Sequence, residues 1–159
     1  MGSAITAPSA LRTQAVPSQE DLNYTHSPSY LSARGFRSWL LTGDHKRIAI
    51  LYLITTTLSF YIGGLFAALV RLELLTPQVD FLGEPETYNK VFSAHGIVMI
   101  FMFLVPAVPA VLGNFLIPLM IGARDLAFPK INLLSWYLYM IGSAFIGYAI
   151  LAGGIDTGW

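Results

Sequence analysis

One histidine, His95, lies inside a long apolar run of this sequence. It is the only ionisable side chain between Lys90 and Arg124. An imidazole inside a membrane helix costs free energy unless it has a partner, so such a histidine is a candidate functional residue. Neutral imidazole is a good axial ligand of haem iron, and Gly96 would leave space beside the ring. The alternative is a packed histidine that donates a hydrogen bond to a carbonyl of another helix.

A second set of polar residues surrounds Asp125. Asn114 precedes this carboxylate by eleven positions and Asn132 follows it by seven. Asparagine side chains both donate to and accept from water, so the pair is suited to ordering a proton-conducting file of water molecules, and a carboxylate at its mouth would collect protons. In the alternative interpretation, Asp125 pairs with Arg124 or Lys130 and the asparagines cap helix ends. The spacing alone favours this second interpretation.

The composition is that of a membrane protein. Hydrophobic residues make up 55% of the chain and charged residues only 11%, whereas a soluble domain carries about 25% charge. Three uncharged stretches, 48–70, 91–123 and 131–155, account for this deficit. A bilayer core of about 30 Å requires about 20 apolar residues in a helix, so each stretch is long enough to span it. We predict an all-α membrane protein with three transmembrane helices at about 47–72, 88–121 and 131–154.

Small and helix-bending residues interrupt the first two predicted helices. Gly63 and Gly64 would let another helix or a flat ligand approach the backbone, and helix packing is the commoner cause. Pro106 and Pro109 each remove a backbone donor in the middle of the second helix and bend it. Such bends are tolerated where neighbouring groups satisfy the freed carbonyls, which favours a larger helix bundle.

The first part of the chain differs in kind. We divide the sequence into a polar amino-terminal tail, residues 1–40, and a membrane domain, residues 41–159. Residues 1 to about 29 resemble a mobile tail and contain no apolar run of the kind a signal peptide needs. The segment 30–41 would either lie along the membrane surface or be a tail anchored by Trp39. The chain has no cysteine, which excludes disulfides and thiolate metal sites, and its net charge of zero gives no indication of nucleic-acid binding.

The distribution of charge predicts the orientation. Basic residues precede the first helix and occupy the connection between the second and third, whereas the other connection is acidic. The basic residues are Arg34, Arg37, Lys46, Arg47, Arg124 and Lys130; the acidic ones are Glu73, Asp80, Glu84 and Glu86. The positive-inside rule therefore puts the amino terminus in the cytoplasm and the end of the third helix, near Asp156, outside. Arg71 and His95 should then lie at similar depth near the outer face, with Asp125 at the inner face.

Four blocks of this sequence resemble the amino-terminal part of subunit I of the haem–copper terminal oxidases, the cytochrome c oxidase family. They are Asp44-His45-Lys46, Arg71-Leu-Glu73, Ala94-His95-Gly96, and the run from Gly113-Asn114 to Asn132 with Ile-Gly-Ala-Arg-Asp-Leu-Ala-Phe-Pro at its centre. The resemblance covers about residues 41–159 and implies three helices of a twelve-helix bundle.

The resemblance implies a role for each candidate residue. His95 would be one axial ligand of the low-spin haem, and Arg71 would hydrogen-bond the formyl group of that haem and raise its reduction potential. Asp125 would be the entrance of a proton pathway, with Asn114 and Asn132 ordering water above it. Glu73 matches a carboxylate that helps to bind a structural cation in some members. The sequence departs from the family at Tyr88, where many members have tryptophan, and at Leu133, where many have a second asparagine.

The resemblance also implies what lies outside these residues. A second ligand of the low-spin haem, the high-spin haem and the copper site belong to later helices, and His26 and His45 cannot complete the haem site from the opposite face. We therefore expect a fragment or one piece of a split subunit, inactive alone. The complete enzyme would reduce oxygen to water, take electrons from cytochrome c and pump protons across a bacterial-type inner membrane.

Cofactors and partners follow from the same resemblance. The low-spin haem would be haem A, and the partners would be the remainder of subunit I, a subunit II with a dicopper site, subunit III, cytochrome c and lipid. Two alternatives stay open: a quinol oxidase of the same superfamily, which Arg71-Leu-Glu73 disfavours, and a non-enzymatic membrane scaffold or transporter with a packed histidine.

Overall fold

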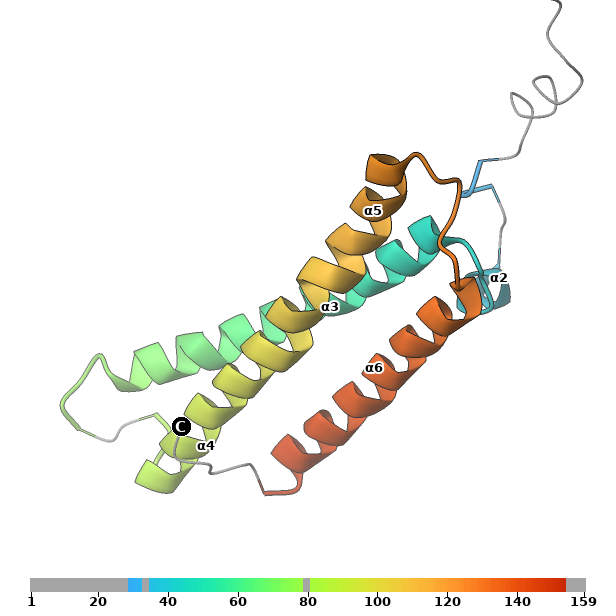
Figure 1. The fold of residues 1–159 in the computed structure, drawn as a ribbon. Helices are drawn as coiled ribbons and strands as arrows, with labels where there is room; N and C mark the ends of the chain where they lie inside the picture. The colour runs from blue at the N-terminus through green and yellow to red at the C-terminus, as the bar shows by residue number, and fades with distance from the viewer. Residues whose placement is uncertain (1–28, 33–34, 79–80, 154–159) are drawn as a thin grey trace, which may run out of the picture.

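The computed structural model describes residues 29–32, 35–78 and 81–153, and these residues form helices joined by turns and short loops. The helices form long rods, and one short helix lies at the side of the molecule, beside the start of the last rod (Figure 1). In chain order they are α2 (Phe36–Leu40), α3 (His45–Glu73), α4 (Pro85–Ile97), the π-helical stretches η1 (Val98–Leu104) and η2 (Ala107–Leu112), α5 (Gly113–Ile121) and α6 (Pro129–Leu151).

Three of these rods are long and apolar enough to cross a membrane: His45–Glu73, Pro85–Ile121 and Pro129–Leu151. The predicted all-α fold with three transmembrane helices is therefore confirmed, with boundaries that differ from the predicted ones by at most three residues. The predicted mobile tail, His26, Arg34, Asp80 and Asp156 lie outside the described residues. The division at residue 40 stays a prediction.

The first rod begins with a side-chain cap. Asp44 is the N-cap of α3, and its carboxylate accepts a hydrogen bond from the backbone N–H of Lys46 at 2.8 Å. Thr42 accepts in turn from the N–H of Asp44 at 3.2 Å. Because the first N–H groups of a helix have no partner within it, these bonds fix where the rod starts. His45 is consequently the first residue of α3. We call the end of the molecule where α3 starts the inner end and the opposite end the outer end, after the orientation that the charge pattern predicts.

The second rod, Pro85–Ile121, continues through its prolines with a change of helix type. Two π-helical stretches lie on either side of Pro106, with backbone bonds that skip one residue more than in an α-helix: Val105 N–H to Ile100 O and Gly113 N–H to Val108 O. Proline cannot donate to the helix ladder, and π-helical turns are one way to absorb the misfit. The prolines thus coincide with a change of helix type, and the bend that we predicted at Pro106 and Pro109 stays a prediction.

This rod ends at a glycine in the left-handed conformation. Gly122 has a φ of 66°, and the N–H groups of Gly122 and Ala123 donate to the carbonyls of Leu119 and Pro118. A positive φ is readily adopted by glycine, which is why helices commonly end there. The turn sends the chain back across the inner face, toward Asp125 and the start of α6.

A buried arginine holds the amino-terminal segment against the inner end of α3. The Arg47 guanidinium donates from Nε to the carbonyl of Tyr30 and from one terminal nitrogen to Ser38 Oγ at 3.1 Å, and it lies 5.4 Å from the centre of the Trp39 ring. These contacts fold α2 back over the first turns of α3. Whether segment 30–41 also lies on the membrane surface stays a prediction.

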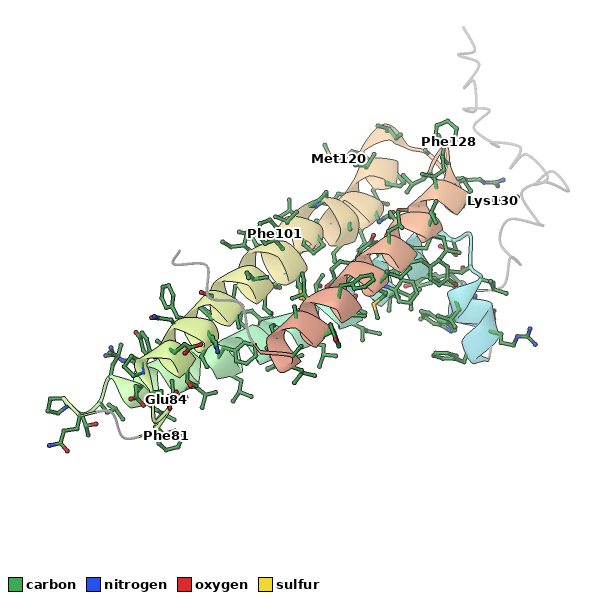
Figure 2. The ribbon with its side chains drawn as sticks, turned by 90° about the horizontal axis from the view of Figure 1, so that it is seen from below. Phe81, Glu84, Phe101, Met120, Phe128 and Lys130 are labelled. Carbon is green, nitrogen blue, oxygen red and sulfur yellow. The ribbon has the colours of Figure 1, made fainter. Side chains whose placement is uncertain are left out.

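The core is small and lies at the inner end. Ile48, Tyr52, Val111 and Trp136, one or two from each rod, form one buried cluster. Elsewhere the rods present apolar side chains outward, as Phe101 and Met120 do in Figure 2, where 54% and 82% of their surfaces are exposed. Such outer faces are typical of helices that contact lipid or further helices.

The two adjacent glycines of α3 have different surroundings. A Cβ added to Gly63 would lie 2.7 Å from Met99 Sδ and 3.3 Å from Val98 Cγ1, whereas nothing lies within 4 Å of a Cβ at Gly64. Helix packing, the commoner of the two causes considered for these glycines, therefore accounts for Gly63.

We predict that Gly63→Val destabilises the packing of α3 against the second rod by about 1–3 kcal/mol, because Met99 and Val98 must both move. Gly64→Val, one position away, is the matched control and should leave stability nearly unchanged. The measurement is the midpoint of heat-induced loss of the helical circular-dichroism signal of this chain in detergent. Equal midpoints for the two variants would contradict the prediction.

Candidate functional site

His95 lies on α4 and is half-buried against α3. Its Nδ1 is 2.8 Å from the backbone carbonyl oxygen of Gly63. A carbonyl oxygen only accepts, so Nδ1 carries the proton and donates, and Nε2 is left with its lone pair free. A hydrogen bond of this kind orients a metal-binding imidazole and fixes its tautomer. The space in which a Cβ of Gly96 would lie holds no atom within 4 Å. Nε2 is therefore the ring nitrogen that could bind a metal.

The depth of His95 corrects our expectation. We expected His95 and Arg71 at similar depth, but His95 contacts Gly63, which precedes Arg71 by eight residues. At 1.5 Å per residue, this separates the two levels by about 12 Å along α3. The reason is the start of the second rod, since α4 begins at Pro85 and Lys90 is already inside it. Depth counted from Lys90 was therefore too shallow, and Arg71 lies nearer the outer end, where it is exposed.

Glu73 organises the outer connection. Its side chain is 9% exposed, and Oε2 accepts hydrogen bonds from the backbone N–H groups of Phe81 at 3.0 Å and Leu82 at 2.8 Å. A cavity of about 270 Å³ beside it is also lined by Glu84 and Asn89. Within the described part of the chain, no group of three or more His, Cys, Asp or Glu side chains is arranged to hold a metal ion. Any cation here would depend on backbone or amide oxygens as well.

Asp125 has a partner that the sequence did not suggest. Asp125 Oδ1 is 2.7 Å from Nδ1 of His45, a residue 80 positions earlier, and it also accepts from the N–H of Leu126. The two side chains differ in exposure, because 48% of the Asp125 side chain is exposed and only 5% of His45. A carboxylate that faces solvent is thus joined to an imidazole that faces the interior. His45 was not among the partners, Arg124 and Lys130, that our alternative named.

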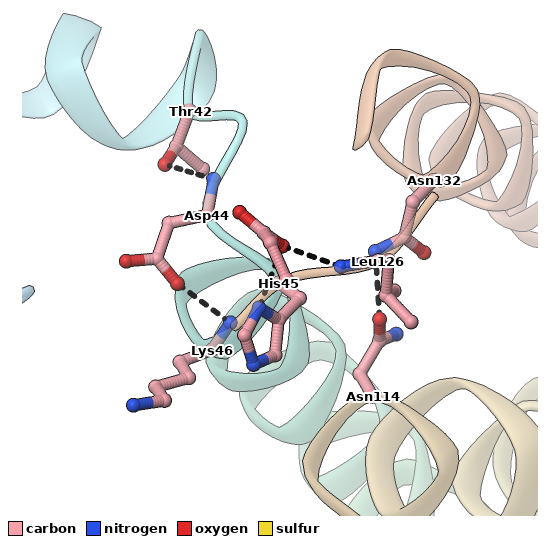
Figure 3. A network of polar contacts seen from close by, with 8 residues as sticks. Thr42, Asp44, His45, Lys46, Asn114, Leu126 and Asn132 are labelled. Atoms are coloured by element: carbon pink, nitrogen blue, oxygen red, sulfur yellow. Dashed lines mark hydrogen bonds and ion pairs between the residues drawn. The ribbon is translucent and has the colours of Figure 1, made fainter. Parts of the chain in front are cut away.

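The two asparagines are bonded to each other. Asn132 Nδ2 donates to Asn114 Oδ1 at 2.6 Å, and Asn114 Nδ2 donates to the carbonyl of Ala110 at 2.6 Å. Figure 3 shows Asn114 and Asn132 facing each other from α5 and α6, beside Leu126 and close to His45. Neither asparagine is an N-cap, since the N-caps of α5 and α6 are Leu112 and Phe128. The capping interpretation is therefore wrong for the starts of these helices.

A cavity of about 410 Å³ lies between the three rods beside the asparagine pair. Leu126, which follows Asp125, lines it together with Asn114, Asn132, Ser135, Tyr52 and Tyr139. Tyr52 Oη lies 2.9 Å from Ser135 Oγ, which donates to the carbonyl of Asn132. The cavity is large enough for several water molecules, and it offers them the polar partners that buried water requires.

Sequence reasoning missed His45, Tyr52, Ser135 and Tyr139. The sequence did contain a signal for Ser135 and Tyr139. They follow Asn132 at helical spacing and so share one face of α6 with it. His45 and Tyr52 come close to the site only through tertiary packing. The structure thus brings Asn114 and Asn132 together, with Asp125 in the loop that joins their helices, and it keeps His95 on α4 and Arg71 and Glu73 at the end of α3. Figure 1 shows that the end of α3 and the start of α4 lie far from the loop between α5 and α6.

These features define an α-helical integral membrane protein with a half-buried imidazole in one half and a cavity beside a pair of asparagines in the other. Residues 47–159 match the family "Cytochrome C and Quinol oxidase polypeptide I". The chain belongs to this family.

Curated relatives agree with the family. Over 116 residues, the chain is 47% identical to cytochrome c oxidase subunit 1 of Thermostichus vulcanus and 45% identical to that of Synechocystis sp.; each match covers 73% of this chain and 21% of the relative. It is 40% identical over 161 residues to the probable cytochrome c oxidase subunit 1-beta of Nocardia farcinica, which covers 98% of this chain and 26% of the relative. The chain thus spans about a fifth to a quarter of the length of these relatives.

Proposed function

We propose that this chain is the part of a haem–copper oxidase catalytic subunit that supplies one low-spin haem ligand and the proton entrance. The complete enzyme would reduce oxygen to water with electrons from cytochrome c and couple this reaction to proton pumping. The observation that carries the haem role is the Nδ1 hydrogen bond of His95 to Gly63, which leaves Nε2 free within an apolar rod. The family and the names of the relatives support the class of enzyme.

The outer half would hold the low-spin haem. His95 would ligate the iron through Nε2, and the carbonyl of Gly63 would keep the ring in place and make it a stronger donor. When bound, the haem supplies one-electron transfer. Arg71 lies nearer the outer face than His95, so its guanidinium would meet a polar substituent at the haem edge and never the iron. Haem A is the type we propose; the high-spin haem and copper would be ligated by residues outside this chain.

The inner half would take up protons. Asp125 is exposed and would collect a proton from the aqueous phase, and the 2.7 Å contact lets His45 share it. Water in the 410 Å³ cavity would carry the proton past Asn114 and Asn132 toward Ser135 and Tyr52. Each amide both donates and accepts, so the pair can order a file of water without holding a charge itself.

The environment follows from the charge pattern and the family. We propose a bacterial-type plasma membrane with the amino terminus in the cytoplasm, together with the remainder of subunit I, a subunit II with a dicopper centre and subunit III as partners. Glu73 would contribute one oxygen to a structural cation, as its counterpart does in some members. A quinol oxidase is the second candidate, because the family description names both donors, but the relatives' names favour cytochrome c.

We predict that His95→Ala abolishes the low-spin haem signal in the assembled oxidase, because the axial nitrogen is lost. His45→Ala removes the other histidine in the described segments and should leave that signal intact. The visible absorption spectrum of the reduced, purified complex measures both variants. A normal low-spin band in His95→Ala would contradict the assignment, and a wild-type complex without any haem band would favour the non-enzymatic scaffold.

We predict that Arg71→Met shifts the visible band of the low-spin haem and lowers its midpoint potential while the haem stays bound. A charged hydrogen-bond donor at the ring edge stabilises the reduced form by withdrawing electron density. Lys90→Met removes a cation from the outer half of the second rod and serves as the control, since Lys90 pairs with Glu86 at 2.6 Å. If the band and the potential are unchanged in Arg71→Met, this arginine only anchors the rod at the interface.

We predict that Asp125→Asn slows oxygen uptake by about tenfold or more, equivalent to at least 1.4 kcal/mol of added barrier, while haem content stays normal. Electron entry to the low-spin haem should stay fast, because proton delivery alone is impaired. Asp44→Asn makes the same charge change at the same membrane face, and asparagine also caps helices well. Stopped-flow reduction combined with steady-state oxygen uptake measures both. Assembled Asp125→Asn enzyme with wild-type oxygen uptake would exclude the entrance role.

A further inference from the structure

Pro106 interrupts the backbone hydrogen bonding around Met102, the residue four positions before it. Met102 lies in η1, and Pro106 has no N–H with which to donate to its carbonyl where the rod returns to the α-helical pattern. An unpaired carbonyl in the hydrocarbon region of a membrane costs several kcal/mol. In this structure the hydroxyl of Tyr139, on α6, donates to Met102 O at 2.7 Å.

The same hydroxyl connects all three rods. Tyr139 Oη lies 3.3 Å from Ser59 Oγ on α3, and the Tyr139 ring packs 5.6 Å from the Tyr52 ring, also on α3. The acceptor, Met102 O, belongs to the second rod, and the donor, Tyr139 Oη, belongs to the third. A side chain of α6 therefore contacts the second rod close to Pro106, at a point between His95 and Asn114.

The residues that this hydrogen bond joins line two different cavities. Tyr139 lines the 410 Å³ cavity beside the asparagine pair, whose wall contains several hydroxyl and amide groups among apolar side chains. Ser59 and Met102 line a second cavity of about 320 Å³, whose other walls include Phe66, Val98 and Ile146 and are almost entirely apolar. The contact of Tyr139 with Met102 and Ser59 therefore links a cavity that offers partners to water with one that offers very few.

We infer that Tyr139 is a positioning residue of the proton pathway. Its hydroxyl donates to the Met102 carbonyl, ties the interrupted part of the second rod to the third rod, and forms part of the wall of the cavity beside the asparagine pair. Water that gathers beside Asn114 and Asn132 is then kept out of the apolar seam between the rods, and Asn114 is held in register with Asn132. This inference rests on the proposed role of the inner half in proton uptake.

Another tyrosine of α6 provides a matched control for the loss of the Tyr139 hydroxyl. Tyr137, two residues earlier on α6, also donates a hydrogen bond of 2.7 Å, but to the carbonyl of Leu40 at the end of α2. Both tyrosines are half-buried. Replacing either by phenylalanine removes one hydroxyl and one tertiary hydrogen bond, and only the Tyr139 change affects the second rod.

The first experiment compares Tyr139→Phe and Tyr137→Phe in the complete, assembled oxidase. Tyr139→Phe should slow both oxygen uptake and the proton-uptake phase after flow-flash mixing roughly threefold to tenfold, as expected from the loss of one buried hydrogen bond. The low-spin haem spectrum and the rate of electron entry should stay normal. Tyr137→Phe should leave proton uptake unchanged. Equal proton-uptake rates in the two variants would overturn the inference, because a merely stabilising hydroxyl would give that result.

The second experiment restores the missing donor. Pro106→Ala provides an N–H that donates to the Met102 carbonyl in the α-helical register, so this carbonyl depends less on Tyr139. The rate of heat-induced loss of haem absorbance is measured for the wild type, both single variants and the double variant. Tyr139→Phe should accelerate this loss in the wild-type background and have a smaller effect in the Pro106→Ala background. Equal effects in the two backgrounds would show that Tyr139 and Pro106 act independently and would overturn the inference.

The two proposals fail in different ways. Wild-type oxygen uptake in Asp125→Asn would remove the proposed proton entrance, whatever the tyrosine variants do. A slow Asp125→Asn enzyme together with identical Tyr139→Phe and Tyr137→Phe enzymes would leave the entrance in place and remove the role of Tyr139 alone.

Discussion

Inside a bilayer no water is available to a backbone carbonyl, so each one must find a donor within the protein. Buried polar side chains need partners for the same reason, and in the described part of this chain three of them use backbone carbonyls. His95 donates to the carbonyl of Gly63, Tyr139 to that of Met102, and Asn114 to that of Ala110. Each donor is a residue of functional interest, and each acceptor is backbone. These three side chains therefore cost less to bury than unpaired polar groups would.

The second rod separates two kinds of chemistry along one helix. Its outer part carries His95 at the level of Gly63, and its inner part carries Asn114 opposite Asn132. Between them lie Pro106 and its two flanking π-helical stretches. An uninterrupted α-helix would keep a fixed rotation between His95 and Asn114, whereas extra residues per turn change the faces that they present. The prolines thus decide which neighbour each side chain meets.

The sequence predicted the three rods because bilayer thickness imposes one length on every span, and an uncharged stretch of that length is visible in composition alone. It predicted the kinds of site residue because an imidazole or a carboxylate is conspicuous among apolar residues. It could not predict the depth of His95, which depends on Pro85 starting α4 before Lys90. Nor could it predict the contact between His45 and Asp125, since 80 residues separate the two and only the folded inner loop brings them together.

The inner end is also where the fold is best packed, and this coincidence has a physical reason. The buried cluster of Ile48, Tyr52, Val111 and Trp136 lies beside the polar cavity and fixes the rods that line it. A hydrogen-bonded pair such as Asn114 and Asn132 tolerates little displacement, because its strength falls steeply with distance and angle. The outer half has no comparable cluster among the described residues, and there His95 relies on the close approach that Gly63 permits. Beyond the buried cluster, the close contact of Gly63 with the second rod is what holds α3 against that rod.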